Sequence, residues 1–113
     1  MAYGKKGDYD RAIADYSAAI QLNPKDAVAF SNRGLVYDDR GELDRAIADY
    51  SQAIRLEPKN ADAFKYRGLA YYDKGYYNRA IADYNETIRL NPQYDEAMRT
   101  LRDQAKAALR DKP

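Results

Sequence analysis

The side chains that first suggest catalysis in this sequence are two pairs of carboxylates. Asp8 with Asp10, and Asp38 with Asp39, have the residue type that general acid and base work requires. Residues one or two positions apart do not face one another on a helix, and no third group with a tuned environment accompanies either pair. We therefore interpret these carboxylates as solvated surface charge.

Nucleophilic and metal-assisted chemistry lack their usual residues. The sequence contains no Cys and no His, which removes thiolate zinc sites, cysteine nucleophiles and the commonest general base. Ser17, Ser31 and Ser51 therefore have no histidine base, and no lysine recurs at a fixed spacing from them. The sequence predicts a protein without catalytic activity, without a metal site and without a cofactor.

The charges of the chain are nearly balanced. Its 113 residues include 19 basic and 18 acidic ones, and no basic run contains interleaved aromatic residues, so we expect no nucleic-acid partner.

The N-terminal segment lacks the apolar core of a signal peptide, and no stretch approaches the ~20 apolar residues that a membrane-spanning helix needs. We expect no membrane partner and a cytoplasmic location.

A six-residue motif recurs at a spacing of 34 residues. RAIADY occupies residues 11–16, 45–50 and 79–84, and prolines follow the same spacing at Pro24, Pro58 and Pro92. A fixed period of this length indicates one supersecondary unit that is stacked repeatedly. Because 12 Tyr and many Ala replace Val and Ile as the apolar residues, the composition favours an all-α protein.

Each period contains two helical patterns separated by a glycine. Phe30, Gly34 and Tyr37 follow helical spacing before Gly41, and the apolar residues after it do the same up to Pro58. We expect Gly34 to face Ala46, so that small residues let the two helices approach closely. The patterns predict helices over 8–22, 27–40, 42–56, 61–74, 76–90 and 94–110.

These residues resemble the tetratricopeptide repeat, or TPR. The pattern reads Phe30, Arg33, Gly34, Tyr37, Ala46, Tyr50 and Pro58 in one copy and Phe64, Arg67, Gly68, Tyr71, Ala80, Tyr84 and Pro92 in the next. Phe stands where this family favours Trp, and Arg33 and Arg67 stand where it favours Leu. The resemblance implies an all-α fold, a right-handed α-solenoid of 34-residue helix-turn-helix repeats with a C-terminal capping helix.

The resemblance also divides the chain, taken as one TPR domain over 1–113. The expected parts are a truncated first repeat (1–24), a second repeat (25–58), a third repeat (59–92) and a capping helix (93–113). By the 34-residue spacing, Ala2 and Tyr3 correspond to Val36 and Tyr37. Most of the first helix of the first repeat is then missing, which indicates a truncated or engineered repeat array.

In proteins of this family, the first helices of successive repeats line a concave groove. The corresponding residues here are Asn32, Leu35, Asp38, Asp39, Lys65, Tyr66, Leu69, Tyr72, Asp73 and Arg99. The resemblance implies a non-catalytic scaffold that binds an extended peptide or a partner helix in this groove. Because acidic side chains outnumber basic ones along it, we expect a neutral or basic ligand.

Some family members clamp the C-terminal carboxylate of a chaperone tail with Lys, Asn and Arg side chains from three repeats. Only Asn32 is retained here, because the expected first clamp helix is absent and Asp62 and Tyr66 occupy the positions of the last basic pair. We therefore expect acidic tails to be rejected.

A structural self-assembly module is the alternative function. If the first helix is missing, residues 8–22 keep an apolar pattern that their own chain does not cover. Ile13, Tyr16 and Ile20 are then the candidate self-association residues, and the chain is expected to form homo-oligomers.

The arginines at the two positions where the family favours Leu need partners. The aspartates of the RAIADY motifs offer two registers. Arg33 and Arg67 pair either within their own repeats, with Asp49 and Asp83, or with the preceding repeat, where the partner of Arg33 is Asp15.

Overall fold

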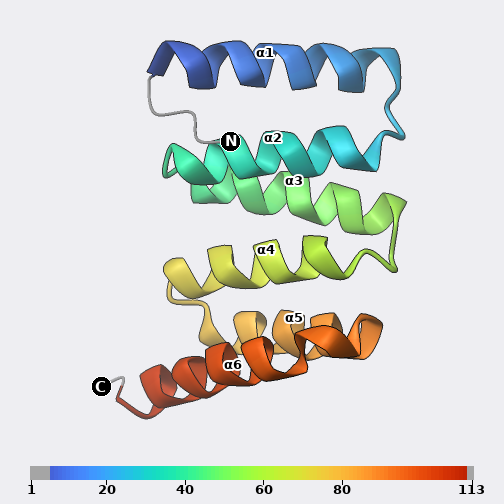
Figure 1. Cartoon of the computed structure of the whole chain (residues 1–113). Helices are drawn as coiled ribbons and strands as arrows, with labels where there is room; N and C mark the ends of the chain where they lie inside the picture. Colours follow the sequence, from blue (N-terminus) through green and yellow to red (C-terminus); the bar gives the residue numbers. More distant parts are fainter. Residues whose placement is uncertain (1–5, 112–113) are drawn as a thin grey trace. The chain divides into compact units, whose positions relative to one another are not determined.

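The computed structural model describes residues 6–111, which form helices in two compact units, Met1–Pro58 and Lys59–Pro113. The first unit contains α1 (Lys6–Leu22), α2 (Ala27–Asp39) and α3 (Leu43–Leu56), drawn from blue to green in Figure 1. The second contains α4 (Ala61–Asp73), α5 (Tyr77–Leu90), a 3-10 turn (Pro92–Tyr94) and α6 (Asp95–Arg110). Within the units, α2 packs on both α1 and α3, and α5 packs on both α4 and α6.

The described residues contain no strand, so the predicted all-α class is confirmed. Each helix boundary lies within two residues of the expected one. Ala2 and Tyr3, on which the interpretation of a truncated first helix rests, lie outside the described residues.

Polar side chains fix where the first helix of each repeat begins. The carboxylate of Asp26 accepts a hydrogen bond from the backbone N–H of Ala29 at 3.1 Å, and the side chain of Asn60 accepts one from Ala63 at 3.2 Å. These contacts satisfy N–H groups that have no partner inside the helix. The turns that follow α2 and α4 contain Gly41 and Gly75, which have φ angles of +79° and +82°.

Replacing Asn60 with alanine is expected to lower the free energy of unfolding by about 1 kcal/mol, because α4 loses its N-cap. Lys59→Ala is the matched control, since Lys59 is an exposed neighbour outside the helix. Urea denaturation followed by circular dichroism measures both variants. Equal midpoints for Asn60→Ala and Lys59→Ala would show that the cap does not stabilise the helix.

Tyrosine and alanine build the interface between paired helices. Tyr50 and Tyr84 have 0% of their surface exposed and belong to the core, whereas Tyr16, Tyr37 and Tyr71 are half-buried. In the second unit the buried core consists of Ala80, Tyr84, Met98 and Ala105. In the second unit α6 therefore packs on this core through Met98 and Ala105.

The glycines of α2 and α4 lie directly against the buried tyrosine rings. A Cβ atom on Gly34 would lie 2.7 Å from Cε1 of Tyr50 and 3.2 Å from Cβ of Asp49. The expected close approach is confirmed, but the atoms nearest to Gly34 belong to these residues rather than to Ala46. Gly68 has the same relation to Tyr84, whose Cε1 would lie 2.8 Å from its Cβ.

Candidate functional site

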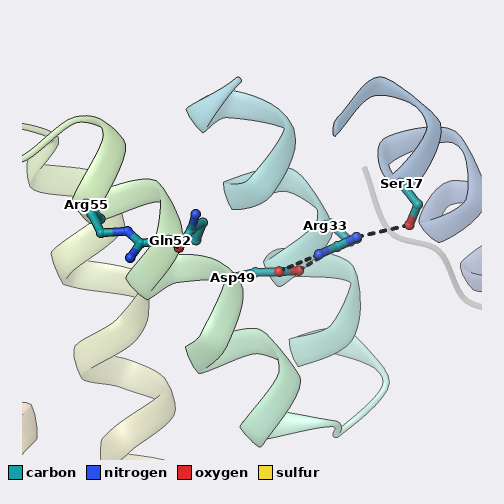
Figure 2. A network of polar contacts seen from close by, with 5 residues as sticks. All are labelled: Ser17, Arg33, Asp49, Gln52 and Arg55. Atoms are coloured by element: carbon teal, nitrogen blue, oxygen red, sulfur yellow. Dashed lines mark hydrogen bonds and ion pairs between the residues drawn. The ribbon is translucent and has the colours of Figure 1, made fainter. Parts of the chain in front are cut away.

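A bidentate ion pair joins the two helices of each complete repeat. Nε and Nη2 of Arg33 donate to the two carboxylate oxygens of Asp49, both at 2.8 Å (Figure 2). Arg67 binds Asp83 in the same way, at 2.9 and 2.8 Å. The register within the repeat is therefore the correct one. Asp15 is exposed and has no arginine partner among residues 6–111.

Two aromatic rings lie close to the guanidinium group of each arginine. The guanidinium carbon of Arg67 lies 5.5 Å from the ring centroid of Phe64 and 5.6 Å from that of Tyr71. Phe30 and Tyr37 hold Arg33 in the same way, at 5.6 and 5.8 Å. This stacking adds a cation–π attraction to each ion pair. The position where the family favours Leu thus stays compatible with the packing of the repeat.

Burial affects the ionisation of the pair in the second unit. Only 4% of the surface of Asp83 is exposed, and this desolvation raises the pKa of its carboxyl group, while the hydrogen bonds from Arg67 act in the opposite direction. The hydrogen bond to Asp83 raises the pKa of Arg67, which stays charged. We interpret the pair as a structural contact between helices, because both groups are already satisfied by each other.

Arg33, the arginine of the second repeat, also contacts the helix before it. Nη1 of Arg33 donates to the hydroxyl of Ser17 in α1 at 3.1 Å, on the side away from Asp49 (Figure 2). Figure 2 also shows the exposed hydrogen bond of Arg55 to Gln52, 2.6 Å long, within α3. The hydroxyl of Ser17 therefore contacts the arginine of the buried ion pair.

On α2, the predicted groove residues differ in how far they are available to a ligand. Asn32 and Leu35 are half-buried, and Asp39 is exposed. Asp38 accepts a hydrogen bond from the hydroxyl of Tyr50 at 3.2 Å. Asp39 is therefore the more accessible of the two neighbouring carboxylates.

On α4, Lys65 lies in a cage of rings and a carboxylate. Its Nζ is 4.9 Å from the ring centroid of Tyr66, 4.7 Å from that of Tyr94 and 3.7 Å from Oδ1 of Asp62. The hydroxyl of Tyr94 donates to Asp62 at 2.5 Å, and this bond raises the pKa of Tyr94. The positive charge of Lys65 is thus compensated within the unit.

Sequence reasoning did not include Tyr94 in this site. The residue lies in the 3-10 turn before α6, outside the helical spacing used to select groove residues. The sequence feature that could have drawn attention to Tyr94 is its position two residues after Pro92, just before the last helix.

The remaining predicted groove residues lie on α4 and α6. Leu69 and Tyr72 pack partly against the core of the unit, and the ring of Tyr72 meets the ring of Tyr77 edge-on at 5.2 Å. Asp73 is exposed. Arg99 of α6 donates to Asp95 at 3.0 Å. Both cations of this predicted surface, Lys65 and Arg99, therefore have acidic partners in their own unit.

The candidate self-association residues are all partly covered. Ile13, Tyr16 and Ile20 are half-buried. The corresponding isoleucines of α3, Ile47 and Ile54, fall in the same class. The isoleucines therefore do not distinguish α1 from a helix inside the array.

Neither a metal site nor a membrane span is found in the part of the chain that the structure describes. Residues 6–111 contain no group of three or more acidic, His or Cys side chains able to hold a metal ion. None of the helices in this range is long and apolar enough to cross a bilayer.

The fold and the recurring contacts define a helical repeat protein. Comparison with known proteins shows to which family of repeat proteins it belongs. The profile described as "TPR repeat" matches residues 2–38 and 37–75, and that described as "Tetratricopeptide repeat" matches 61–94. The chain belongs to the tetratricopeptide repeat family, whose α-solenoid fold class it shares.

The curated relatives are much longer than this chain. Serine/threonine-protein phosphatase 5 of Homo sapiens and that of Rattus norvegicus are each 51% identical to it over 35 residues. This match covers 31% of the chain and 7% of each phosphatase.

Two solved TPR domains are similar over most of the chain. The structure titled "First TPR of Spaghetti (RPAP3) bound to HSP90 peptide SRMEEVD" is 27% identical, with a TM-score of 0.87, over 96% of this chain and 86% of that one. The second TPR domain of the human RPAP3 protein, in complex with HSP70 peptide SGPTIEEVD, is 30% identical, with a TM-score of 0.81, over 89% and 83%.

Proposed function

We propose that this chain is a non-catalytic protein-interaction module that binds an extended peptide or a partner helix. The support comes from its family and from two similar TPR domains whose structures contain chaperone peptides. The proposed contact residues of the first unit are Asn32, Leu35, Asp38 and Asp39 on α2. Those of the second unit are Lys65, Tyr66, Leu69, Tyr72 and Asp73 on α4 and Arg99 on α6.

The observation that carries the proposed ligand chemistry is the distribution of paired and exposed charges. Lys65 and Arg99 are compensated by Asp62 and Asp95, whereas Asp39 and Asp73 are exposed. An incoming carboxylate would meet no uncompensated cation of this set, while an incoming cation would meet exposed carboxylates. We therefore propose that the ligand is neutral or basic.

The chaperone peptide SRMEEVD provides a direct test of this preference. We expect this chain to bind SRMEEVD more weakly than SRMQQVN with an amidated C-terminus, in which every carboxylate is replaced by an amide. Fluorescence polarisation with the two labelled peptides measures the difference. Tighter binding of SRMEEVD would overturn the proposed charge preference but would leave the interaction module intact.

Tyr66 is the expected aromatic anchor of this surface, because it is half-buried and held by Lys65 beside the exposed part of α4. With the tightest peptide selected from a random twelve-residue display library, Tyr66→Ala should weaken binding ~30-fold, as for an aromatic hot spot. Tyr76→Ala, at an exposed tyrosine outside the predicted surface, is the control. Equal affinities for the two variants, or a library that yields no binder, would contradict the proposed surface.

The alternative function, self-assembly through Ile13, Tyr16 and Ile20, stays a prediction, as does the cytoplasmic location. Sedimentation over a hundredfold concentration range measures the self-assembly.

A further inference from the structure

The turn that leads into the second helix of a repeat differs in charge between the two complete repeats. In the second repeat it reads Gly-Glu-Leu-Asp-Arg over 41–45, and in the third it reads Gly-Tyr-Tyr-Asn-Arg over 75–79. Both carboxylates of the earlier copy are replaced by uncharged side chains, while the arginine is kept. The third copy therefore carries an arginine charge without the two acidic neighbours that accompany it in the second.

In the second repeat, this arginine is paired with one of those carboxylates. Nη1 of Arg45 lies 3.3 Å from Oε1 of Glu42, and the guanidinium carbon of Arg45 lies 5.7 Å from the ring centroid of Tyr37. The other carboxylate oxygen of Glu42 lies 3.0 Å from Nε of Arg40. The charge of Arg45 is therefore compensated within the first unit.

In the third repeat, Arg79 keeps the neighbouring ring but has no carboxylate. Its guanidinium carbon lies 5.8 Å from the ring centroid of Tyr71, a distance similar to that of the corresponding pair in the second repeat, and 5.6 Å from that of Tyr76. Tyr76 occupies the position of Glu42. The guanidinium of Arg79 has neither an ion pair nor a hydrogen bond among residues 6–111. Its planar set of N–H donors, which matches a carboxylate, is therefore available to a ligand.

Arg79 lines a cavity of about 470 Å³ in the second unit. This volume lies in the range of small-molecule sites, ~300–1,000 Å³. Tyr76 is 46% exposed, so part of its ring is open to a ligand, and Nζ of Lys74 lies 5.3 Å from the centroid of that ring. The residues that line the cavity are Gly75, Tyr76, Tyr77, Asn78, Arg79 and Leu109.

We propose that this cavity binds a small aromatic carboxylate. The carboxylate of the ligand pairs with the guanidinium of Arg79, as Glu42 does with Arg45 in the second repeat, and its ring packs against Tyr76 and Leu109. The site shares no residue with the peptide surface proposed above and does not depend on it.

The charge and the lining of the cavity together favour this class of ligand. A cation would be repelled by Arg79, and a neutral ring would leave the donors of the guanidinium without an acceptor. A carboxylate without a ring would leave the tyrosine and leucine surfaces of the lining uncovered. A ligand that combines both groups contacts both parts of the cavity.

Indole-3-acetate is the probe, because it joins a flat two-ring body to one carboxylate. We expect saturable binding to the full chain with one molecule per chain and a dissociation constant on the order of 1 mM, as for a good ligand of this size. Chemical shifts of the ¹⁵N-labelled chain measure the binding, and the largest changes should occur at the amides of residues 75–79. Indole-3-acetamide, which has the same shape without the charge, should bind at least ~10-fold more weakly.

Variants at the two positions that distinguish the repeats identify the site. Arg79→Gln should weaken binding of indole-3-acetate at least ~10-fold. Arg45→Gln is the matched control, because it makes the same change at the same position of the repeat, where the arginine already has its carboxylate. All variants are checked for unchanged helicity by circular dichroism.

Tyr76→Glu restores the residue that the second repeat has at this position. The new carboxylate should occupy Arg79 from within the chain and weaken binding of the probe at least ~10-fold. Tyr76→Gln is the control for the lost ring, and it should weaken binding less than Tyr76→Glu does.

Three results would overturn the proposal. The first is no saturable binding of indole-3-acetate up to ~10 mM. The second is equal binding by the Arg79→Gln and Arg45→Gln chains, which would place the probe elsewhere. The third is binding of acetyl-glutamyl-amide as tight as that of indole-3-acetate, since the site would then recognise an acidic side chain of a protein rather than an aromatic acid.

Discussion

Replacing Arg67 with leucine is expected to lower the free energy of unfolding by about 3 kcal/mol at pH 7. The carboxylate of Asp83 would remain almost fully buried while losing both of its hydrogen bonds from the guanidinium. Removing one partner of a buried ion pair leaves an uncompensated charge, which costs more than the pair itself contributes. Denaturant unfolding followed by circular dichroism measures this loss.

The loss should depend on pH in a direction that identifies its cause. Burial already raises the pKa of Asp83, and the pKa should rise further without Arg67. A carboxyl group whose pKa is higher in the folded state stabilises the fold fully below its unfolded pKa, near 3.9, and loses that contribution as the pH rises through the folded value. The difference between the Arg67→Leu chain and the original chain should therefore be smaller at pH 4 than at pH 7.

Two further variants separate this effect from simple loss of an arginine. Arg89→Leu removes an exposed arginine that pairs with the half-buried Glu86, and it should cost much less than Arg67→Leu. Adding Asp83→Leu to Arg67→Leu should recover part of the stability, because no charge is then buried. An equal loss for Arg67→Leu and Arg89→Leu, or a loss independent of pH, would show that Asp83 is not the cause.

Replacing Gly68 with leucine should cost about 3 kcal/mol, the second large effect that the structure predicts. The added Cβ would lie 2.8 Å from Cε1 of Tyr84, and this ring has no exposed surface toward which it can move. Gly7→Leu is the control, since a Cβ at Gly7 meets nothing within 4 Å. Differential scanning calorimetry measures both variants.

The collision can be tested from its other side. If the ring of Tyr84 is what opposes leucine at position 68, the double variant Gly68→Leu with Tyr84→Ala should lose less stability than the sum of the two single variants. Additive losses would assign the cost of Gly68→Leu to another contact.

The fold was predictable because two independent signals agree. The 34-residue spacing of RAIADY locates the repeats, and the helical spacing around Phe30, Gly34 and Tyr37 locates the helices to within two residues. The register of Arg33 was not predictable in the same way. Spacing alone places two aspartates near this arginine, and the rotation of α2 about its axis, set by Gly34 against Tyr50, decides between them.

The candidate peptide surface was predictable in its residues but not in its charges. The resemblance selects Lys65 and Arg99, whereas their pairing with Asp62 and Asp95 depends on side-chain conformations within the second unit. The contribution of Tyr94 depends in addition on the irregular turn that brings its hydroxyl to Asp62. Periodicity carries no information about such a turn.

The pairing of Arg33 with Asp49, and of Arg67 with Asp83, joins residues 16 positions apart within one repeat. Each whole repeat therefore contains both partners of its own buried ion pair. Copies can be inserted or deleted in units of 34 residues without stranding an arginine or an aspartate, whereas in the opposite register the arginine of the first copy and the aspartate of the last copy would have no partner in the array. Variation of copy number, by gene duplication or by design, thus changes the length of such an array while preserving the electrostatic balance of its interior.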